Sequence, residues 1–205
     1  MNQALSHLKA DPQLYRIIKK VPLVIPKQES NVYEVLLRTV VEQQLSVKAA
    51  RSIWQRVKVQ LNHDLSPTQI LEADKELLRG CGLSYPKVNY FKNVAKFAHE
   101  GQLHDKNLHA LDDAALIKHL STIKGVGKWS AEMILMFSLG RQNVFPIDDL
   151  VIRNAMIKLY GLTSEKRALF SELEEIASHW APYRSYACYL LWDWYEGNIE
   201  IGYRS

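Results

Sequence analysis

Two short stretches of this chain hold residues that can do chemistry. The first is Leu120–Ala131, where Gly125 and Gly127 lie between two segments with apolar residues at helical spacing. Glycines let another backbone approach closely, and the N–H groups that begin the second helix suit a phosphate because the helix dipole lies behind them. The second is the carboxylate pair Asp148 and Asp149, one short segment further on. A phosphate-binding turn followed by carboxylates indicates chemistry on a nucleic acid.

The glycine turn allows two interpretations. A helix-hairpin-helix would hold a DNA backbone phosphate through Val126, Gly127 and Lys128, with Lys124 adding positive charge. A plain corner between two helices would pack apolar residues and bind nothing. A lone Gly-Val-Gly favours the corner, whereas the extended pattern LxxIKGVGKWSA favours the phosphate-binding hairpin. Contacts of this kind fix position rather than sequence, and they make binding depend on salt.

The carboxylate pair also has a simple explanation. Asp148 or Asp149 can cap the helix that follows, because an aspartate before a helix accepts hydrogen bonds from its first N–H groups. Capping requires only one of the two aspartates, so it does not explain the other. A carboxylate in a cleft can stabilise positive charge that develops on a sugar, or orient and deprotonate water. The residues alone leave open which aspartate has which role.

Aromatic residues gather just after the glycine turn and near the end of the chain. Trp129 follows the turn directly, and the last predicted helix carries Tyr183, Tyr186, Tyr189, Trp192, Trp194 and Tyr195. Flat, electron-rich faces can hold an extruded base, most strongly a cationic one. Core packing explains any single aromatic residue here, but Trp129 and Trp192 together favour a base pocket.

A polar joint between two predicted helices contains Gln44, Leu45 and Ser46. Leu45 is an apolar side chain that could enter a base stack and hold a kinked duplex open. Gln44 could then fill the hydrogen bonds of the base left without a partner, and Ser46 can cap the helix that follows. Taken alone, the same residues would make an ordinary turn.

Composition excludes several classes of protein. The 205 residues are 47% hydrophobic, which argues against disorder, and the formal net charge of +4 is low for a protein that coats DNA without specificity. The two cysteines, Cys81 and Cys188, cannot form a four-thiolate zinc or iron–sulfur site, so we expect buried free thiols in a reducing compartment. No signal peptide and no apolar run of membrane-spanning length is evident, which predicts a soluble cytosolic protein.

Nearly every segment has helical periodicity, and capping signals mark several starts. Asp11 with Pro12, Ser46, Ser66 with Gln69, and Asp74 each precede an apolar repeat at helical spacing. No segment alternates as a strand, and Val21–Pro26 is interpreted as a linker. The prediction is therefore an all-α fold. Leu78–Leu83 also resembles a helix, glycine turn and helix, which is either a second, degenerate hairpin or an ordinary helix end.

At these residues the chain resembles the helix-hairpin-helix (HhH-GPD) DNA glycosylase superfamily, and within it the compact form of the DNA-3-methyladenine glycosylase II branch. The motifs that carry the resemblance are spread over most of the chain: Glu42–Ser46, Leu120–Ala131, Phe145–Arg153, and Tyr183–Ala187 with Trp192. The compact form is indicated because an N-terminal β-rich domain known in one bacterial relative has no room here. The last aromatic set also differs from that relative by a residue inserted after Trp192.

The resemblance implies a role for individual residues. Asp149 matches the catalytic aspartate of the family, and Asp148 remains a candidate beside the substrate. Trp129 occupies the position where bifunctional relatives have a lysine that attacks the sugar, which implies a monofunctional enzyme. Leu45 matches the wedge, with Gln44 before it, and Trp192 joins Trp129 in the base pocket. The cysteines of the family's iron–sulfur cluster are missing.

The resemblance also implies the architecture and the reaction. We expect one domain over residues 1–205, with one lobe from about 1–28 plus 145–205, the other from about 29–144, the hairpin at 113–139 and a cleft between the lobes. The enzyme would flip alkylated purines of the 3-methyladenine type from double-stranded DNA and hydrolyse the N-glycosidic bond. We expect a monomer with no membrane partner and no side-chain metal site. Hairpin carbonyls could hold Na⁺ or K⁺, the one cofactor that the family suggests.

Two rival functions follow from the same residues. A noncatalytic module that binds DNA structure would gain nothing from an acid near phosphates, so Asp149 argues against it. A glycosylase for oxidised or deaminated bases would in its lyase form need the hairpin lysine that Trp129 replaces. The expected location is the cytoplasm, beside the nucleoid, if the source is bacterial, and the nucleus if it is eukaryotic.

Overall fold

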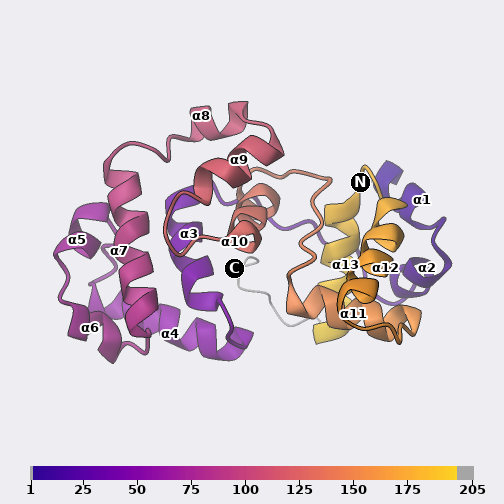
Figure 1. Cartoon of the computed structure of the whole chain (residues 1–205), viewed down its shortest axis with the longest axis horizontal. Coiled ribbons are helices and arrows are strands. Elements are labelled where there is room, and N and C mark those ends of the chain that lie inside the picture. Colours follow the sequence, from indigo (N-terminus) through magenta and orange to yellow (C-terminus); the bar gives the residue numbers. More distant parts are fainter. Residues whose placement is uncertain (1, 198–205) are drawn as a thin grey trace. The chain divides into compact units, whose positions relative to one another are not determined.

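The computed structural model describes residues 2–197, apart from the side chains of residues 105 and 106, and every regular element in that range is a helix (Figure 1). The predicted all-α class is therefore confirmed. The chain forms two compact units. One combines the residues up to Lys27 with those from Gly140 onward, and the other runs from Gln28 to Leu139.

Among the described residues, the first unit contains five helices. They are α1 (Asn2–Leu8), α2 (Pro12–Ile18), α11 (Leu150–Tyr160), α12 (Lys166–Ser178) and α13 (Arg184–Glu196). Helix α13 packs against α2 and α11, so the two ends of the chain share one core. Asp11 fastens them together. Its Oδ1 accepts from the N–H groups of Gln13 and Leu14, and its Oδ2 accepts from Tyr160 Oη at 2.6 Å and Trp180 Nε1 at 3.0 Å.

The second unit is built around α3 (Val32–Glu42), which is buried along most of its length, including the polar residues Arg38 and Thr39. The other helices are α4 (Val47–Gln60), α5 (Pro67–Glu72), α6 (Lys75–Gly80), α7 (Tyr85–His99), α8 (Asp105–Ala110), α9 (Asp113–Leu120) and α10 (Lys128–Met133), followed by the π-helix η1 (Ile134–Ser138). Helix α3 packs against α4, α7, α10 and η1, so it supports the whole unit.

Most of the predicted helix starts are confirmed. Ser46, Ser66, Asp74 and Asp11 each accept a hydrogen bond from the first turn of the helix that they precede. Two short helices, α1 and α8, were not predicted, because neither has a capping side chain at its start like those that mark the equally short α5 and α6. The helical spacing after the glycine turn predicts an α-helix from about Lys128 to Gly140, and that prediction is wrong in its second half. There the chain widens into a π-helix, in which Leu139 N donates to Ile134 O five residues back.

Candidate active site

The turn between α3 and α4 presents an apolar side chain at its tip. Leu45 is 41% exposed, and Gln44 before it has φ +58°, a left-handed conformation that is uncommon for a residue other than glycine. Ser46 Oγ accepts from Ala49 N and starts α4. The turn is therefore tight and strained, and it holds Leu45 outward. This geometry suits the predicted wedge better than an ordinary turn, whose tip would be polar.

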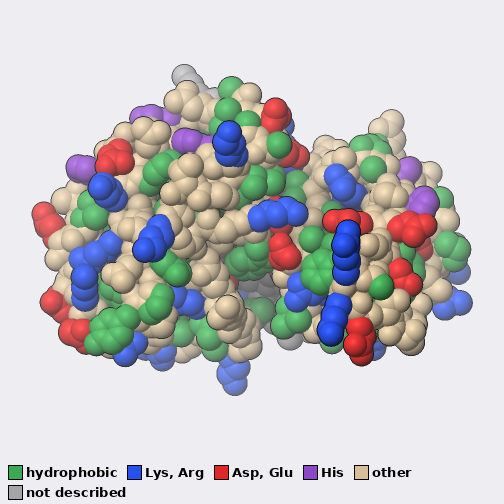
Figure 2. All heavy atoms as spheres, viewed as in Figure 1, with side chains coloured by type: hydrophobic (Ala, Val, Ile, Leu, Met, Phe, Trp, Pro, Cys, Tyr) green, Lys and Arg blue, Asp and Glu red, His purple; other side chains and the backbone are tan. Residues whose placement is uncertain are grey.

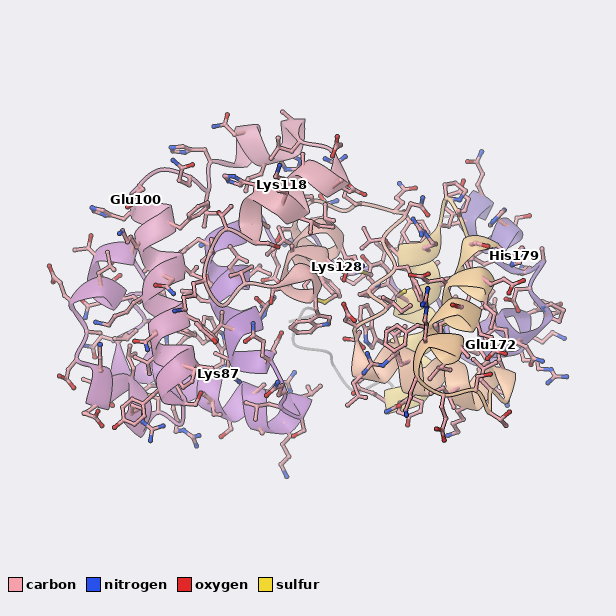
Figure 3. The ribbon with its side chains drawn as sticks, viewed as in Figure 1. Lys87, Glu100, Lys118, Lys128, Glu172 and His179 are labelled. Atoms are coloured by element: carbon pink, nitrogen blue, oxygen red, sulfur yellow. The ribbon has the colours of Figure 1, made fainter. Side chains whose placement is uncertain are left out.

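Two polar side chains hold this turn in place. Lys87 extends from α7 (Figure 3), and its Nζ donates to the carbonyl oxygens of Val41 and Gln43, both at 2.7 Å. Burial lowers the pKa of Lys87, and the charge of Glu42 opposes that shift. Gln43 Nε2 donates to the carbonyl of Gly125 at 2.9 Å, which ties the α3–α4 turn to the glycine turn. No spacing in the sequence indicates either contact, because both join residues far apart along the chain.

The predicted hairpin is formed by α9, the glycine turn and α10, and its two glycines do different work. Gly125 has φ +102°, and a Cβ at this position would overlap the ring of Tyr90 on α7. Gly125 is therefore required for packing. Gly127 has an extended backbone, and a Cβ there would meet no atom within 4 Å. It precedes α10 in open space, where it leaves room for another molecule.

One backbone amide just before α10 donates a hydrogen bond within the protein. Val126 buries its side chain, and its N–H donates to Ile123 O at 2.9 Å. The buried side chain of Val126 therefore anchors the turn, and its N–H already has an acceptor within the protein. Gly127 has no side chain with which to cap α10, and the first N–H groups of a helix have no partner within the helix. The predicted phosphate contact therefore cannot use the amide of Val126 and is expected at Gly127 and Lys128.

The segment Leu78–Leu83, which resembles the hairpin in sequence, also folds as a helix, a turn and a helix. It is formed by the end of α6 and the start of α7. Gly82 has φ +105°, close to the value of Gly125. Ser84, however, occupies the position that corresponds to Gly127, and its Oγ accepts from Lys87 N at 3.4 Å. The protein itself caps this helix start, so the structure supports the ordinary, packing role for this turn.

The lysines of the hairpin differ in their surroundings. Lys124 is exposed beside the turn. Lys128 (Figure 3) lies 3.6 Å from Glu132 one turn later on α10, and Glu132 is buried. Part of the charge of Lys128 is therefore compensated within the protein. Figure 2 shows Lys and Arg side chains spread over the face in view, with acidic side chains between them, which agrees with the formal net charge of +4.

Several hairpin carbonyls that could hold a monovalent cation already accept hydrogen bonds. The carbonyl of Ile123 accepts from Val126 N, that of Lys124 from Asn93 Nδ2, and that of Gly125 from Gln43 Nε2. Each of these oxygens has a second lone pair, so a monovalent cation held by the hairpin carbonyls stays a prediction. Across residues 2–197, the described side chains also contain no cluster of three or more His, Cys, Asp or Glu that could hold a metal.

Asp149 lies at the start of α11 and is only 8% exposed. Its Oδ1 accepts from Ile152 N at 2.9 Å and from Trp192 Nε1 at 3.2 Å. Asp148 is exposed, and its backbone carbonyl accepts from Arg153. The helix cap and the residue that matches the family's catalytic aspartate are therefore the same residue. Capping does not compete with chemistry here, because it fixes the carboxylate.

The surroundings of Asp149 stabilise a negative charge. Two N–H donors and the N-terminal end of α11 point at the carboxylate. A second acid is close, because burial raises the pKa of Glu196 and the charge of Asp149 raises it further.

Trp192 is placed as a partner of Asp149. It is 4% exposed and stacks on Tyr189 with ring centroids 6.2 Å apart, while its indole N–H reaches the carboxylate. Trp129 is half-buried on α10 in the other unit. Because each unit is described by itself, a base pocket shared by the two tryptophans stays a prediction, as does the cleft between the lobes.

Comparison with known proteins gives the class of this arrangement. The profile of the family described as HhH-GPD superfamily base excision DNA repair protein matches residues 37–179, so the chain belongs to that superfamily. The family predicted from the motifs is confirmed. Helices of the described region are all too short or too polar to cross a membrane.

Individual relatives narrow the class. The chain is 36% identical over 200 residues to DNA-3-methyladenine glycosylase 1 of Schizosaccharomyces pombe, covering 94% of this chain and 86% of the relative. It is 33% identical over 197 residues to the alkylbase DNA glycosidase-like protein mag2 of the same yeast, covering 93% and 92%. A solved structure of S. pombe 3-methyladenine DNA glycosylase in complex with abasic DNA superposes with a TM-score of 0.84 at 32% identity, covering 93% and 95%.

Proposed function

We propose that this chain is a monofunctional DNA glycosylase that excises alkylated purines of the 3-methyladenine type from double-stranded DNA. The observation that carries the proposal is Asp149, a buried carboxylate held by two N–H donors in a chain of the HhH-GPD superfamily. The names of the relatives support alkylated bases as the substrate class. We expect the enzyme to act as a monomer wherever DNA is kept, in the bacterial cytoplasm or the eukaryotic nucleus.

Binding would use the second unit. The amides at Gly127 and Lys128 bind a backbone phosphate, with Lys124 adding charge, and this contact sets the register without reading sequence. Leu45, exposed on its rigid turn, fills the space that the extruded nucleotide leaves. Gln44 beside it would meet the base left opposite.

The chemistry would use the first unit. Methylation at purine N3 or N7 gives the base a positive charge, so the base is a good leaving group. The bond between C1′ and the purine nitrogen breaks, its electron pair leaves with the base, and positive charge develops on the sugar. The Asp149 carboxylate stabilises that charge and accepts the proton of the water that adds to C1′. The products are the free base and an abasic site.

The same residues argue against strand cleavage. Trp129 stands where a lysine nucleophile would be required, and an indole nitrogen is neither basic nor nucleophilic. Lys128 is adjacent, but successive residues on a helix point about 100° apart. Its ammonium lies near Glu132, one turn along α10. No step of this mechanism requires a cofactor or a metal ion.

The test is a direct assay of base release. Purified protein is incubated with duplex DNA treated with a methylating agent, and released bases are separated by chromatography. We expect 3-methyladenine-type bases to be released by the wild-type protein and far more slowly by Asp149→Asn. Release of no base from methylated, ethenoadenine- or hypoxanthine-containing DNA, with duplex binding intact, would instead support a noncatalytic DNA-binding module.

A further inference from the structure

The segment that leads to Asp149 has no helix or strand of its own, yet it is held at four successive residues. Ser185, the second residue of α13, is fully buried. Its Oγ donates to Arg141 O at 2.7 Å and accepts from Val144 N at 3.0 Å. Its N–H donates to Gln142 O at 3.0 Å. One serine thus satisfies three backbone groups of the segment.

Arg184 holds the remaining residue of this stretch. Its Nε donates to Asn143 Oδ1 at 2.8 Å, and its Nη2 donates to Asn143 O at 2.9 Å. A guanidinium that donates two parallel hydrogen bonds fixes direction as well as distance. Arg184 and Ser185 therefore form a clamp on residues 141–144, and this clamp is the first turn of α13.

Little freedom remains between the clamp and Asp149. The ring of Phe145 packs edge-on against Trp180, with centroids 5.9 Å apart. Ile147 N donates to Phe145 O, and Asp149 N donates to Pro146 O, both at 2.9 Å. A shift of the chain at residue 144 is therefore passed on to Asp149 rather than absorbed in the segment.

Helix α13 also holds the carboxylate itself, through Trp192 and its 3.2 Å bond to Oδ1. Residues 185 and 192 are seven apart, so they lie two turns from each other on one face of the helix. One rigid element consequently positions both the segment and the charged group at its end.

We propose that Ser185, together with Arg184, is a positioning residue for Asp149, so that the first turn of α13 sets the place of the carboxylate in the reaction. This inference rests on the proposed catalytic role of Asp149. A serine that served only the stability of the fold would affect the fraction of folded protein and leave the rate of the folded enzyme unchanged. The two roles therefore differ in a measurable quantity.

The experiment measures single-turnover base release from methylated duplex DNA with enzyme in excess, at a temperature where each variant is folded by circular dichroism. Ser185→Ala should release base about 10- to 100-fold more slowly, since a displacement of about 1 Å can cost that much. Its Kd for an abasic-site duplex should stay within about two-fold of wild type. Ser185→Thr, which keeps the hydroxyl, should recover most of the rate. Ser171→Ala, an exposed serine on α12 that bonds only a carbonyl of its own helix, is the matched control and should match wild type.

A double-mutant cycle shows whether the effect passes through Asp149. In the Asp149→Asn background, Ser185→Ala should change the residual rate by less than about two-fold. An equal fold-loss in both backgrounds, or a Ser185→Ala enzyme with the wild-type rate, would overturn the inference. If Ser185→Ala does not fold, Arg184→Gln undergoes the same cycle with the same criteria. A fully active Asp149→Asn would instead refute the proposed catalytic residue, so the two failures are distinct.

Discussion

Replacing Asp149 by asparagine removes the charge of the carboxylate and almost nothing else. Asparagine is as good a helix cap as aspartate, and its Oδ1 can still accept from Ile152 N and Trp192 Nε1. The lost charge costs about 1 kcal/mol of unfolding free energy at most, through the weaker interaction with the start of α11. Asp149→Asn should therefore fold and bind DNA as the wild-type protein does.

The rate is expected to respond much more strongly. A carboxylate about 4 Å from a unit positive charge contributes about 4 kcal/mol at an effective dielectric constant of about 20. The amide dipole of asparagine retains part of this interaction. We therefore expect excision to slow by at least about 100-fold, which corresponds to roughly 2.7 kcal/mol of barrier.

The assay is single-turnover base release, with thermal unfolding and abasic-duplex binding measured on the same preparations. Asp148→Asn is the matched control, because Asp148 is exposed and should keep most of the activity. A dead Asp148→Asn beside a fully active Asp149→Asn would refute the assignment. A wild-type rate in Asp149→Asn, which keeps the helix cap, would show that Asp149 serves only as a cap.

Three further predictions concern binding and the type of reaction. Gly127→Ala should weaken DNA binding with little loss of stability, because the added Cβ meets no protein atom. Gly125→Ala should unfold the hairpin, because its Cβ would overlap the ring of Tyr90. Duplex titration and thermal melting distinguish the two outcomes. Lys124→Ala and Lys128→Ala should each lower the slope of log K against log salt by about 0.9 if that lysine neutralises one phosphate, equally on all sequences; a loss confined to one sequence would contradict a phosphate contact. Borohydride should trap no protein–DNA adduct, because Trp129 cannot form a Schiff base, and strand breaks should appear only after alkali; a trapped complex would overturn the monofunctional interpretation.

Local signals in the sequence predicted much of the fold. Caps and first-turn prolines are formed by neighbouring residues, so Asp11, Ser46, Ser66 and Asp74 could be identified from the residues alone. The change to a π-helix at Ile134 could not, because it depends on how η1 packs against α3. Periodicity describes one helix at a time and contains no information about its neighbours.

The candidate site likewise contains residues that local sequence patterns identify and residues that they do not. Asp149, Leu45 and the glycine turn stand in recognisable local patterns. Lys87 and Ser185 do not, since each acts on backbone groups more than 40 positions away in the chain. The motif around Ser185 carried the family resemblance without any indication of its role. Only the folded chain shows that it clamps the segment before Asp149.

The two glycine turns of the second unit differ in the residue that precedes the second helix. Gly82 and Gly125 have nearly the same positive φ, and each is followed by a buried apolar residue and a helix start. At α7 the next residue is Ser84, whose hydroxyl accepts from the first-turn amide of Lys87, so the protein supplies its own cap. At α10 it is Gly127, which offers no side-chain cap, and we propose that a phosphate oxygen of DNA accepts a hydrogen bond at this helix start. The phosphate oxygen would then supply what the serine supplies in the other turn. In that proposal, the difference between a packing corner and a DNA-binding hairpin is which molecule caps the second helix.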